Sequence, residues 1–283
     1  MPEEQPLNTN ELLKGGSGRR FYRVNKPDAS WSAIAMHYTM ERPENARFET
    51  ATHFLDSNKV NVPSILAKKL NSHLLWLTDL GTHDLWSTRN ENWDNVQAPL
   101  YRAALIQVFK IHTVPVTDNP DLPSLEKPFD SALYQWEQDY FFKEFALRFT
   151  ESPETEIEDL RRSQEARALI DELIQIPRQL IHRDFQSQNI MIRDSDAWLI
   201  DYQGMRLGLP EYDLASLLFD PYVSISATHR DELIEFYFSL KKEAGHSDSL
   251  ETIRHRIFLC ATQRLMQALG AYGFLGISKE KTS

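Results

Sequence analysis

Short runs of hydrophobic residues separated by turn residues dominate the first part of the chain. Residues 19–24 and 32–38 have the composition of strands, and residues 74–78 predict a short buried strand. The apolar positions within residues 47–58 recur at helical spacing. The order strand, glycine loop, strand, strand, helix, strand predicts a compact α+β lobe from residue 11 to about residue 80.

From about residue 82 the hydrophobic pattern becomes helical. Apolar side chains within residues 100–111 share one face of a helix, and residues 131–149 form an aromatic-rich amphipathic pattern that favours a core helix. Residues 151–172 are strongly acidic and predict a solvated helix with its entry loop. We therefore expect a bilobal α+β protein with a small strand-rich lobe over residues 1–81 and a larger helical lobe over residues 82–283.

The composition limits the classes of partner. With 31 Lys and Arg residues against 41 Asp and Glu residues, the net charge of −10 argues against binding to nucleic acid or to an anionic membrane. The single cysteine, Cys260, lies in an apolar run, where a buried and inert thiol is expected. The N-terminus lacks the pattern of a secretory signal, and no apolar run approaches the ~20 residues of a membrane span. We expect a cytoplasmic protein.

The segment most informative about chemistry lies in the second half of the chain. Ile190–Ile192 and Ala197–Ile200 predict two short strands joined by turn residues. Folded as a hairpin, they place Asn189 and Asp201 side by side at the open end, with the Asp184 loop just before them. Oxygen-bearing side chains suit a divalent cation, and the Asp184 carboxylate stays free to accept a proton from a hydroxyl. The alternative is that polar residues flank this hairpin because hairpin ends are exposed.

The spacing of these residues resembles a known pattern. The order His-Arg-Asp, four residues, Asn, a hairpin and Ile-Asp-x-x-Gly is similar to the aminoglycoside phosphotransferase and choline kinase family, which shares the protein-kinase-like fold. The resemblance implies that Asp184 is the catalytic base, that Asn189 and Asp201 bind Mg²⁺, and that ATP donates its γ-phosphoryl group. It also implies that Asp213 anchors the catalytic loop, with a plain helix-start acid as the alternative.

Two further segments match the nucleotide-binding parts of this family. The glycine-rich turn that contains Ser17 and Gly18 fits a loop covering phosphates, with Arg20 supplying positive charge. Asp79 and Leu80 follow a strand and resemble the hinge between lobes, where backbone groups would meet adenine. Ordinary turns are the alternative interpretation of both segments.

The third strand departs from the family pattern. A phosphate-binding lysine is usual there, whereas Met36 occupies the equivalent position in this sequence. In the family this lysine usually forms an ion pair with a glutamate of the following helix, and Glu49 is the candidate for that glutamate here. Because the lysine is missing, this ion pair is not expected. The positive charge would come from one of four arginines: Arg19, Arg20, Arg23 or Arg206.

The residues around the catalytic loop also bear on the acceptor. His-Arg-Asp-Phe-Gln-Ser and Ile-Asp-Tyr-Gln-Gly look like the bacterial kinases that phosphorylate the anomeric hydroxyl of N-acetylmuramate and N-acetylglucosamine. Gln186 and Gln203 are neutral amides that can donate to and accept from sugar hydroxyls, or can simply brace the loops. The expected partner is thus a small molecule with a hydroxyl group, and a monomer is favoured with the oligomeric state left open.

Two other functions remain open from the sequence. A kinase for aminoglycosides or choline-like alcohols is one, because the acidic helical lobe would attract cations. A pseudokinase that binds nucleotide or a protein partner is the other, favoured by Met36. The intact Asp184, Asn189 and Asp201 argue against it, because a scaffold needs none of them.

Overall fold

The computed structural model describes the chain over residues 7–12, 18–40 and 43–280. Its packing divides the chain into two compact units, each discontinuous in sequence. The first unit consists of residues 1–126 and 187–205, and the second of residues 127–186 and 206–283. The lobe boundary expected after residue 81 stays a prediction, because these units follow packing rather than chain order.

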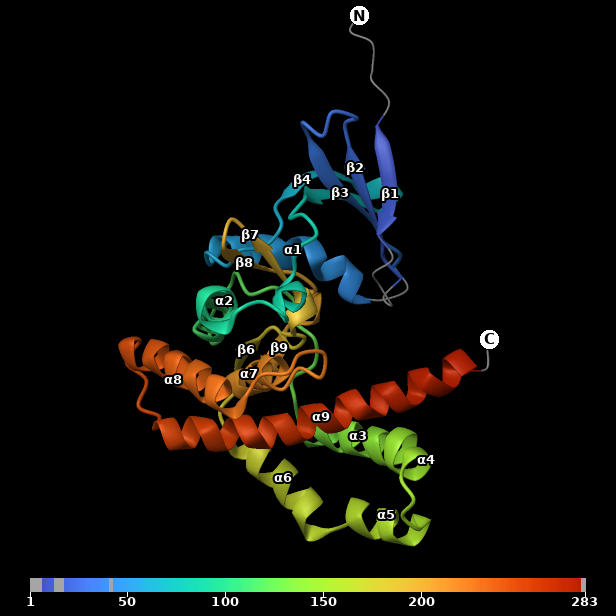
Figure 1. Cartoon of the computed structure of the whole chain (residues 1–283), viewed down its shortest axis with the longest axis vertical. Coiled ribbons are helices and arrows are strands. Elements are labelled where there is room, and N and C mark those ends of the chain that lie inside the picture. Colours follow the sequence, from blue (N-terminus) through green and yellow to red (C-terminus); the bar gives the residue numbers. More distant parts are fainter. Residues whose placement is uncertain (1–6, 13–17, 41–42, 281–283) are drawn as a thin grey trace, which may run out of the picture. The chain divides into compact units, whose positions relative to one another are not determined.

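An antiparallel sheet of five strands belongs to the first unit (Figure 1). In spatial order its strands are β1 (Asn8–Leu12), β2 (Arg20–Asn25), β3 (Ser32–His37), β5 (Leu74–Thr78) and β4 (Ile65–Lys69). β3 lies at the centre and buries Ala33 and Met36 completely, whereas the edge strand β4 exposes most of its residues. The strands expected at residues 19–24, 32–38 and 74–78 are confirmed, and β4 is an addition to the prediction.

Two helices and a hairpin complete the first unit. α1 (Pro43–Ser57) contains the helix expected over residues 47–58, and α2 (Ala98–His112) begins with a proline in its first turn and packs against the hairpin. The predicted hairpin forms from β7 (Ile190–Arg193) and β8 (Asp196–Leu199), which pair antiparallel. Shorter helical turns are η1 (Leu70–Ser72), η2 (Leu85–Thr88), η3 (Trp93–Gln97), η5 (Ser187–Asn189) and η6 (Tyr202–Gly204).

The second unit is mostly helical. Its helical elements are α3 (Ser131–Phe141), η4 (Phe142–Ala146), α4 (Leu147–Phe149), α5 (Glu154–Arg161), α6 (Gln164–Gln175), α7 (Pro210–Leu218), α8 (Ala227–Glu243) and α9 (Leu250–Glu280). Two short strands, β6 (Gln179–Ile181) and β9 (Arg206–Gly208), pair antiparallel. The acidic segment divides into two helices because Ser163 caps the start of α6 by accepting a hydrogen bond from the Ala166 amide. Within the described part of the chain, no helix has both the length and the apolar character to span a membrane.

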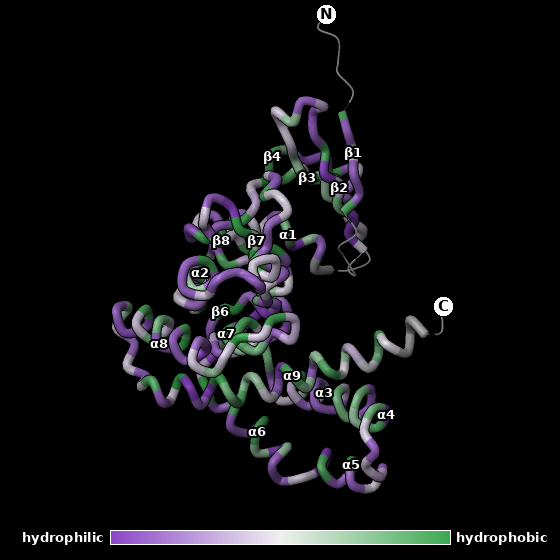
Figure 2. The backbone as a smooth tube through the Cα atoms, in the orientation of Figure 1, coloured by the Kyte–Doolittle hydropathy of each residue, from purple (hydrophilic) through white to green (hydrophobic). Residues whose placement is uncertain are grey.

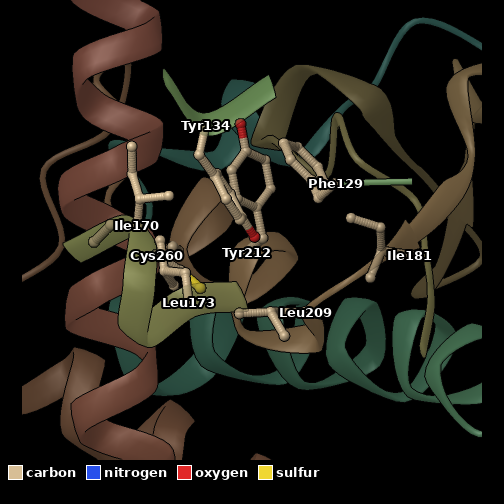
Figure 3. Close-up of a cluster of buried hydrophobic side chains, with 10 residues drawn as sticks. Phe129, Tyr134, Ile170, Leu173, Ile181, Leu209, Tyr212 and Cys260 are labelled. Atoms are coloured by element: carbon tan, nitrogen blue, oxygen red, sulfur yellow. The ribbon is translucent and has the colours of Figure 1, made fainter. Parts of the chain in front are cut away.

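The core of the second unit gathers around three aromatic rings (Figure 3). Phe129 lies 5.1 Å from Tyr134 and 4.7 Å from Tyr212, measured between ring centroids. Cys260 of α9 is fully buried in this cluster, and burial raises the pKa of its thiol. The expectation of a buried thiol at this position is confirmed, and the core joins α6, α7 and α9 beside the strand that leads to Asp184.

The long helix α9 packs along α3 and η4. Hydrophobic segments recur along it, as the green stretches in Figure 2 show. The backbones of α9 and η4 approach closely at Gly273, where an added Cβ atom would lie 2.0 Å from the carbonyl oxygen of Glu144. Only glycine permits this approach, because any side chain would force α9 away from η4.

Replacing Gly273 by Ala should destabilise the protein by roughly 1–3 kcal/mol, because the new methyl group overpacks this contact. Gly276→Ala is the matched control, since nothing lies within 4 Å of a Cβ atom there. This control should be neutral or stabilising by up to about 1 kcal/mol, the difference in helix propensity between Ala and Gly. Urea unfolding measures both changes. Equal effects of the two substitutions would show that the close approach is not structurally important.

Candidate active site

The loop that carries Asp184 is held by a buried carboxylate. Asp213, in the first turn of α7, accepts hydrogen bonds from the backbone amides of His182 at 2.7 Å and Arg183 at 2.8 Å. Arg183 has a φ of 80°, in the left-handed region that residues with a side chain rarely adopt. The two hydrogen bonds offset the cost of this conformation. The anchoring role that the family resemblance implies for Asp213 is confirmed by this geometry.

Asp184 forms an ion pair with the neighbouring Arg183. Burial acts to raise the pKa of Asp184, but the guanidinium groups of Arg183 and Arg264 outweigh it, so the pKa lies below its usual range. The carboxylate is therefore ionised at neutral pH. It can accept a proton without first losing one, as a general base must.

The hairpin brings Asn189 and Asp201 together at its open end. The amide of Ile200 donates to the carbonyl oxygen of Asn189 at 3.0 Å, so the residue before β7 lies opposite the residue that precedes Asp201. Asp201 has a φ of 65°, a second left-handed residue in the site. The next residue, Tyr202, is buried and shares a hydrogen bond of 2.7 Å with Thr52 of α1. The packing of Tyr202 thereby fixes where Asp201 lies.

Asp201 is already engaged by two side chains. Its Oδ1 atom accepts from Nη2 of Arg19 at 2.7 Å and from Nε2 of Gln203 at 2.8 Å. Carboxylate and amide oxygens are the ligand types that Mg²⁺ prefers, so Asn189 and Asp201 fit a magnesium site. Among the described residues, no three of the types His, Cys, Asp and Glu gather as a metal cluster. A cation held here would rely on other oxygens, as Mg²⁺ does when phosphates and water complete its shell.

The predicted hinge is braced by an arginine. Arg23 donates from Nε and Nη2 to the two carboxylate oxygens of Asp79 at 2.8 Å and 3.0 Å. Nη2 of Arg23 also donates to the carbonyl oxygen of Gly81 at 2.6 Å, and the Gly81 amide returns a bond of 2.9 Å to Asp79. Burial acts to raise the pKa of Asp79, but the hydrogen bonds from Arg23 and Gly81 outweigh it. With its carboxylate engaged, Asp79 can offer a nucleotide only its backbone.

The predicted phosphate loop is only partly described. Gly18 has a φ of 70°, which favours glycine at this turn, and Ser17 lies outside the described residues. Arg20 is exposed on β2, where Tyr22 and Glu11 raise the pKa of its guanidinium. The roles of these residues in phosphate binding stay predictions.

The position of the missing lysine is occupied by apolar packing. Met36 is fully buried on β3, opposite Phe21 of β2 and Leu75 of β5. Glu49 of α1, the expected partner of such a lysine, forms an ion pair with Lys68 of β4 at 2.5 Å instead. The ion pair that the family usually forms between β3 and α1 is thus replaced by an ion pair between the edge strand β4 and α1.

The two compact units divide the predicted site residues between them. Asn189, Asp201 and Gln203 belong to the first unit and lie together there. Asp184 and Gln186 belong to the second unit, where the Gln186 amide donates to the Asp184 carbonyl oxygen at 3.0 Å. Gln186 is therefore hydrogen-bonded to the predicted base, Asp184, and Gln203 is hydrogen-bonded to the predicted metal ligand, Asp201.

Sequence reasoning missed the ion pairs of this site. The pairing of Arg183 with Asp184 is signalled only by adjacency within His-Arg-Asp, which does not reveal where either side chain points. The contact of Arg19 with Asp201 joins residues 182 positions apart. A possible signal was that Arg19 and Arg20 are successive residues at the start of an expected strand, where neighbouring side chains tend to point to opposite sides.

The chain is similar to named kinases over most of its length. It is 28% identical over 269 residues to the N-acetylmuramate/N-acetylglucosamine kinase of Pseudomonas putida, a match that covers 90% of this chain and 73% of that protein. It is 26% identical to the kinase of the same name from Pseudomonas aeruginosa, covering 93% of this chain and 76% of that protein.

Solved structures share the fold. An ADP-bound aminoglycoside phosphotransferase, APH(2'')-Ib, superposes with a TM-score of 0.59 at 13% identity, covering 92% of this chain and 94% of that one. A choline kinase from Cryptosporidium parvum gives a TM-score of 0.59 at 13% identity, covering 96% and 84%. These likenesses confirm the protein-kinase-like fold. A model of the Phosphotransferase enzyme family matches residues 9–246, and the chain belongs to that family.

Proposed function

We propose that this phosphotransferase moves the γ-phosphoryl group of Mg-ATP to the anomeric hydroxyl of N-acetylmuramate or N-acetylglucosamine. The observation that carries this acceptor is the similarity, over at least 80% of the chain, to kinases named for these two sugars in three bacterial species. The reaction needs ATP, and the cytoplasm supplies it, so we place the enzyme there. The proposal treats the chain as acting alone on a small molecule.

Asp184 is the proposed catalytic base. Its carboxylate is ionised because of Arg183, and the loop that carries it is fixed by Asp213. A fixed and ionised carboxylate is suited to orient an acceptor hydroxyl and take its proton as the phosphoryl group transfers. His182 is buried beside Phe185, with 6.0 Å between ring centroids, and its role is to shape the loop.

Asn189 and Asp201 are the proposed Mg²⁺ ligands. A magnesium ion bound there would neutralise charge on the phosphates of ATP. The hydrogen bond between Ile200 and Asn189 and the buried Tyr202 hold these two residues in place. Pre-set ligands lower the cost of ordering the site when the cation binds.

ATP would lie against the first unit in this proposal. Ser17, Gly18 and Arg20 are the proposed phosphate contacts, and the backbone of Asp79 and Leu80 is the proposed adenine contact. The bidentate pair between Arg23 and Asp79 supports the second assignment, because it fixes the backbone at the hinge.

Gln186 and Gln203 are the proposed contacts to the sugar. An amide can both donate to a hydroxyl and accept from it, which suits a neutral ring. A cationic acceptor would be better served by a free carboxylate at these positions. A kinase for aminoglycosides or choline-like alcohols therefore remains the second candidate, and the fold shared with proteins of those names at 12–13% identity does not favour it over sugars.

Replacing Asp184 by Asn should lower turnover by roughly 10²–10⁴ while leaving nucleotide affinity nearly unchanged, because the base is lost but not the ATP contacts. Asp194→Asn is the matched control: it makes the same chemical change at the exposed tip of the hairpin. Steady-state kinetics and calorimetric titration with ADP measure the two effects. Turnover within threefold of the parent would exclude Asp184 as the base.

Replacing Arg183 by Gln should move the acidic limb of the pH profile of kcat/KM to higher pH. In the parent, Arg183 holds the pKa of Asp184 below its usual range, so the base form is lost only at low pH. Without Arg183, burial dominates and the pKa rises, so activity is lost earlier as the pH falls. Arg161→Gln, at a surface ion pair of α5, is the control and should not shift the limb. An unshifted limb in Arg183→Gln would contradict the assignment.

The acceptor is tested with a panel of sugars, kanamycin and choline, and with phosphorus NMR of each product. N-acetylglucosamine and N-acetylmuramate should give sugar 1-phosphates, and their methyl glycosides should not react, because the attacking hydroxyl is blocked. A site built to bond particular hydroxyls rejects analogues that lack them strongly. A 6-phosphate product, an active methyl glycoside, or a preference for kanamycin or choline would overturn the anomeric-kinase proposal while leaving phosphoryl transfer intact.

A further inference from the structure

Arg19 stands between the glycine turn and β2, and its guanidinium contacts the proposed metal ligand. Nη2 of Arg19 lies 2.7 Å from Oδ1 of Asp201, and the Arg19 side chain is only 5% exposed. We propose that Arg19 replaces the lysine missing from β3: it neutralises Asp201 before the substrates bind, and it turns to the phosphates of ATP when Mg²⁺ takes Asp201. This inference rests on the proposed use of Mg-ATP.

The register of the sheet places Arg19 on the appropriate face. Phe21 of β2 pairs with Met36 of β3, so both point to the same side of the sheet. Arg19 immediately precedes β2, and its guanidinium lies 5.9 Å from the centre of the Phe21 ring, so it lies on the same side of the sheet as Phe21. Arg19 therefore reaches, from the neighbouring strand, the face on which a lysine at residue 36 would lie.

Two of the other three candidate arginines have contacts elsewhere. Arg23 holds Asp79 and the Gly81 carbonyl oxygen at the hinge. Arg206 belongs to the second unit, where its guanidinium lies 5.2 Å from the centre of the Phe129 ring. Arg20 is exposed, and its pKa is raised by Tyr22 and Glu11 rather than by a predicted site residue. Arg19, by contrast, forms an ion pair with a proposed metal ligand, Asp201.

The ion pair makes metal and nucleotide binding depend on each other. Arg19 and Gln203 both donate to Oδ1 of Asp201, and within the described residues Oδ2 accepts no hydrogen bond. A divalent cation at Oδ2 would repel the nearby guanidinium of Arg19 and weaken its ion pair with Asp201. A phosphate group is a suitable new partner, because guanidinium binds it with paired hydrogen bonds. A cation at Asp201 would therefore weaken the pair between Arg19 and Asp201 and favour a contact of the guanidinium with phosphate.

Three full-length proteins test this coupling: the parent, Arg19→Met and Arg20→Met. Each substitution removes one positive charge at neighbouring positions and keeps a long apolar side chain. Binding of Mn²⁺ alone is followed by electron paramagnetic resonance, and binding of ATP alone is followed by calorimetry in the presence of a chelator. No acceptor is present, so the outcome does not depend on which molecule is phosphorylated.

In Arg19→Met we expect the affinity for Mn²⁺ and the affinity for ATP to change in opposite directions. Arg19→Met should bind Mn²⁺ about three- to tenfold more tightly, because the cation no longer competes with Arg19 for Asp201. The same variant should bind metal-free ATP about tenfold more weakly, about 1.4 kcal/mol, because a phosphate contact is lost. Arg20→Met should leave Mn²⁺ affinity unchanged, since it does not touch Asp201, whatever it does to ATP.

A structural role for Arg19 would give a different result. If Arg19→Met weakens both ligands together, or leaves Mn²⁺ affinity unchanged, the exchange of partners is wrong. A larger loss of ATP affinity in Arg20→Met than in Arg19→Met would also overturn the proposal. If Arg19→Met folds poorly, Arg19→Lys is the alternative variant, because it keeps the positive charge but not the paired hydrogen bonds of a guanidinium. Arg19→Lys should retain most of the affinity for ATP. A tenfold loss of ATP affinity in this variant would count against the proposal. ATP binding in the parent without any kinase activity would contradict the proposed function and not this inference.

Discussion

The carboxylate of Asp213 accepts hydrogen bonds from two successive backbone amides, and the catalytic loop depends on it. Without Asp213 these two backbone donors would lose their partner, one in a buried and one in a partly buried position, which costs more than an ordinary hydrogen bond contributes. The same bonds hold Arg183 in its left-handed conformation, from which it pairs with Asp184. The position and the charge of the proposed base thus both follow from one buried acid on α7.

The sequence predicts most of the fold because buried elements carry a strong hydrophobic signal. The central strand Ser32–His37 buries Ala33, Ala35 and Met36, its neighbour Leu74–Thr78 alternates half-buried and buried positions, and both were predictable within a residue. The edge strand Ile65–Lys69 exposes four of its five residues and contains a register shift. Such a strand is specified by its partner rather than by its own pattern, so periodicity cannot reveal it.

The site was predictable where chain geometry alone brings residues together. Asn189 and Asp201 flank a hairpin, and any hairpin with that turn makes them neighbours. Contacts between distant segments were not predictable in this way. Whether Arg19 or Arg20 meets Asp201 depends on where β2 begins and which way each side chain points there, and a one-residue change of register would exchange the two. Sequence composition alone treats these arginines as equivalent.

Three acids of the predicted site are each paired with an arginine. Asp79 binds Arg23, Asp184 binds Arg183, and Asp201 binds Arg19, in a chain whose net charge is −10. Arginine keeps its charge at any relevant pH, so it keeps a partly buried carboxylate ionised where lysine could lose its proton. The pairs differ in what must happen next. The pair between Arg23 and Asp79 at the hinge can persist during the reaction. The base Asp184 must expose an oxygen to the acceptor hydroxyl, and the metal ligand Asp201 must exchange Arg19 for the cation. The Arg183–Asp184 and Arg19–Asp201 pairs therefore have to be strong enough to orient the two carboxylates and weak enough to separate when the substrates bind.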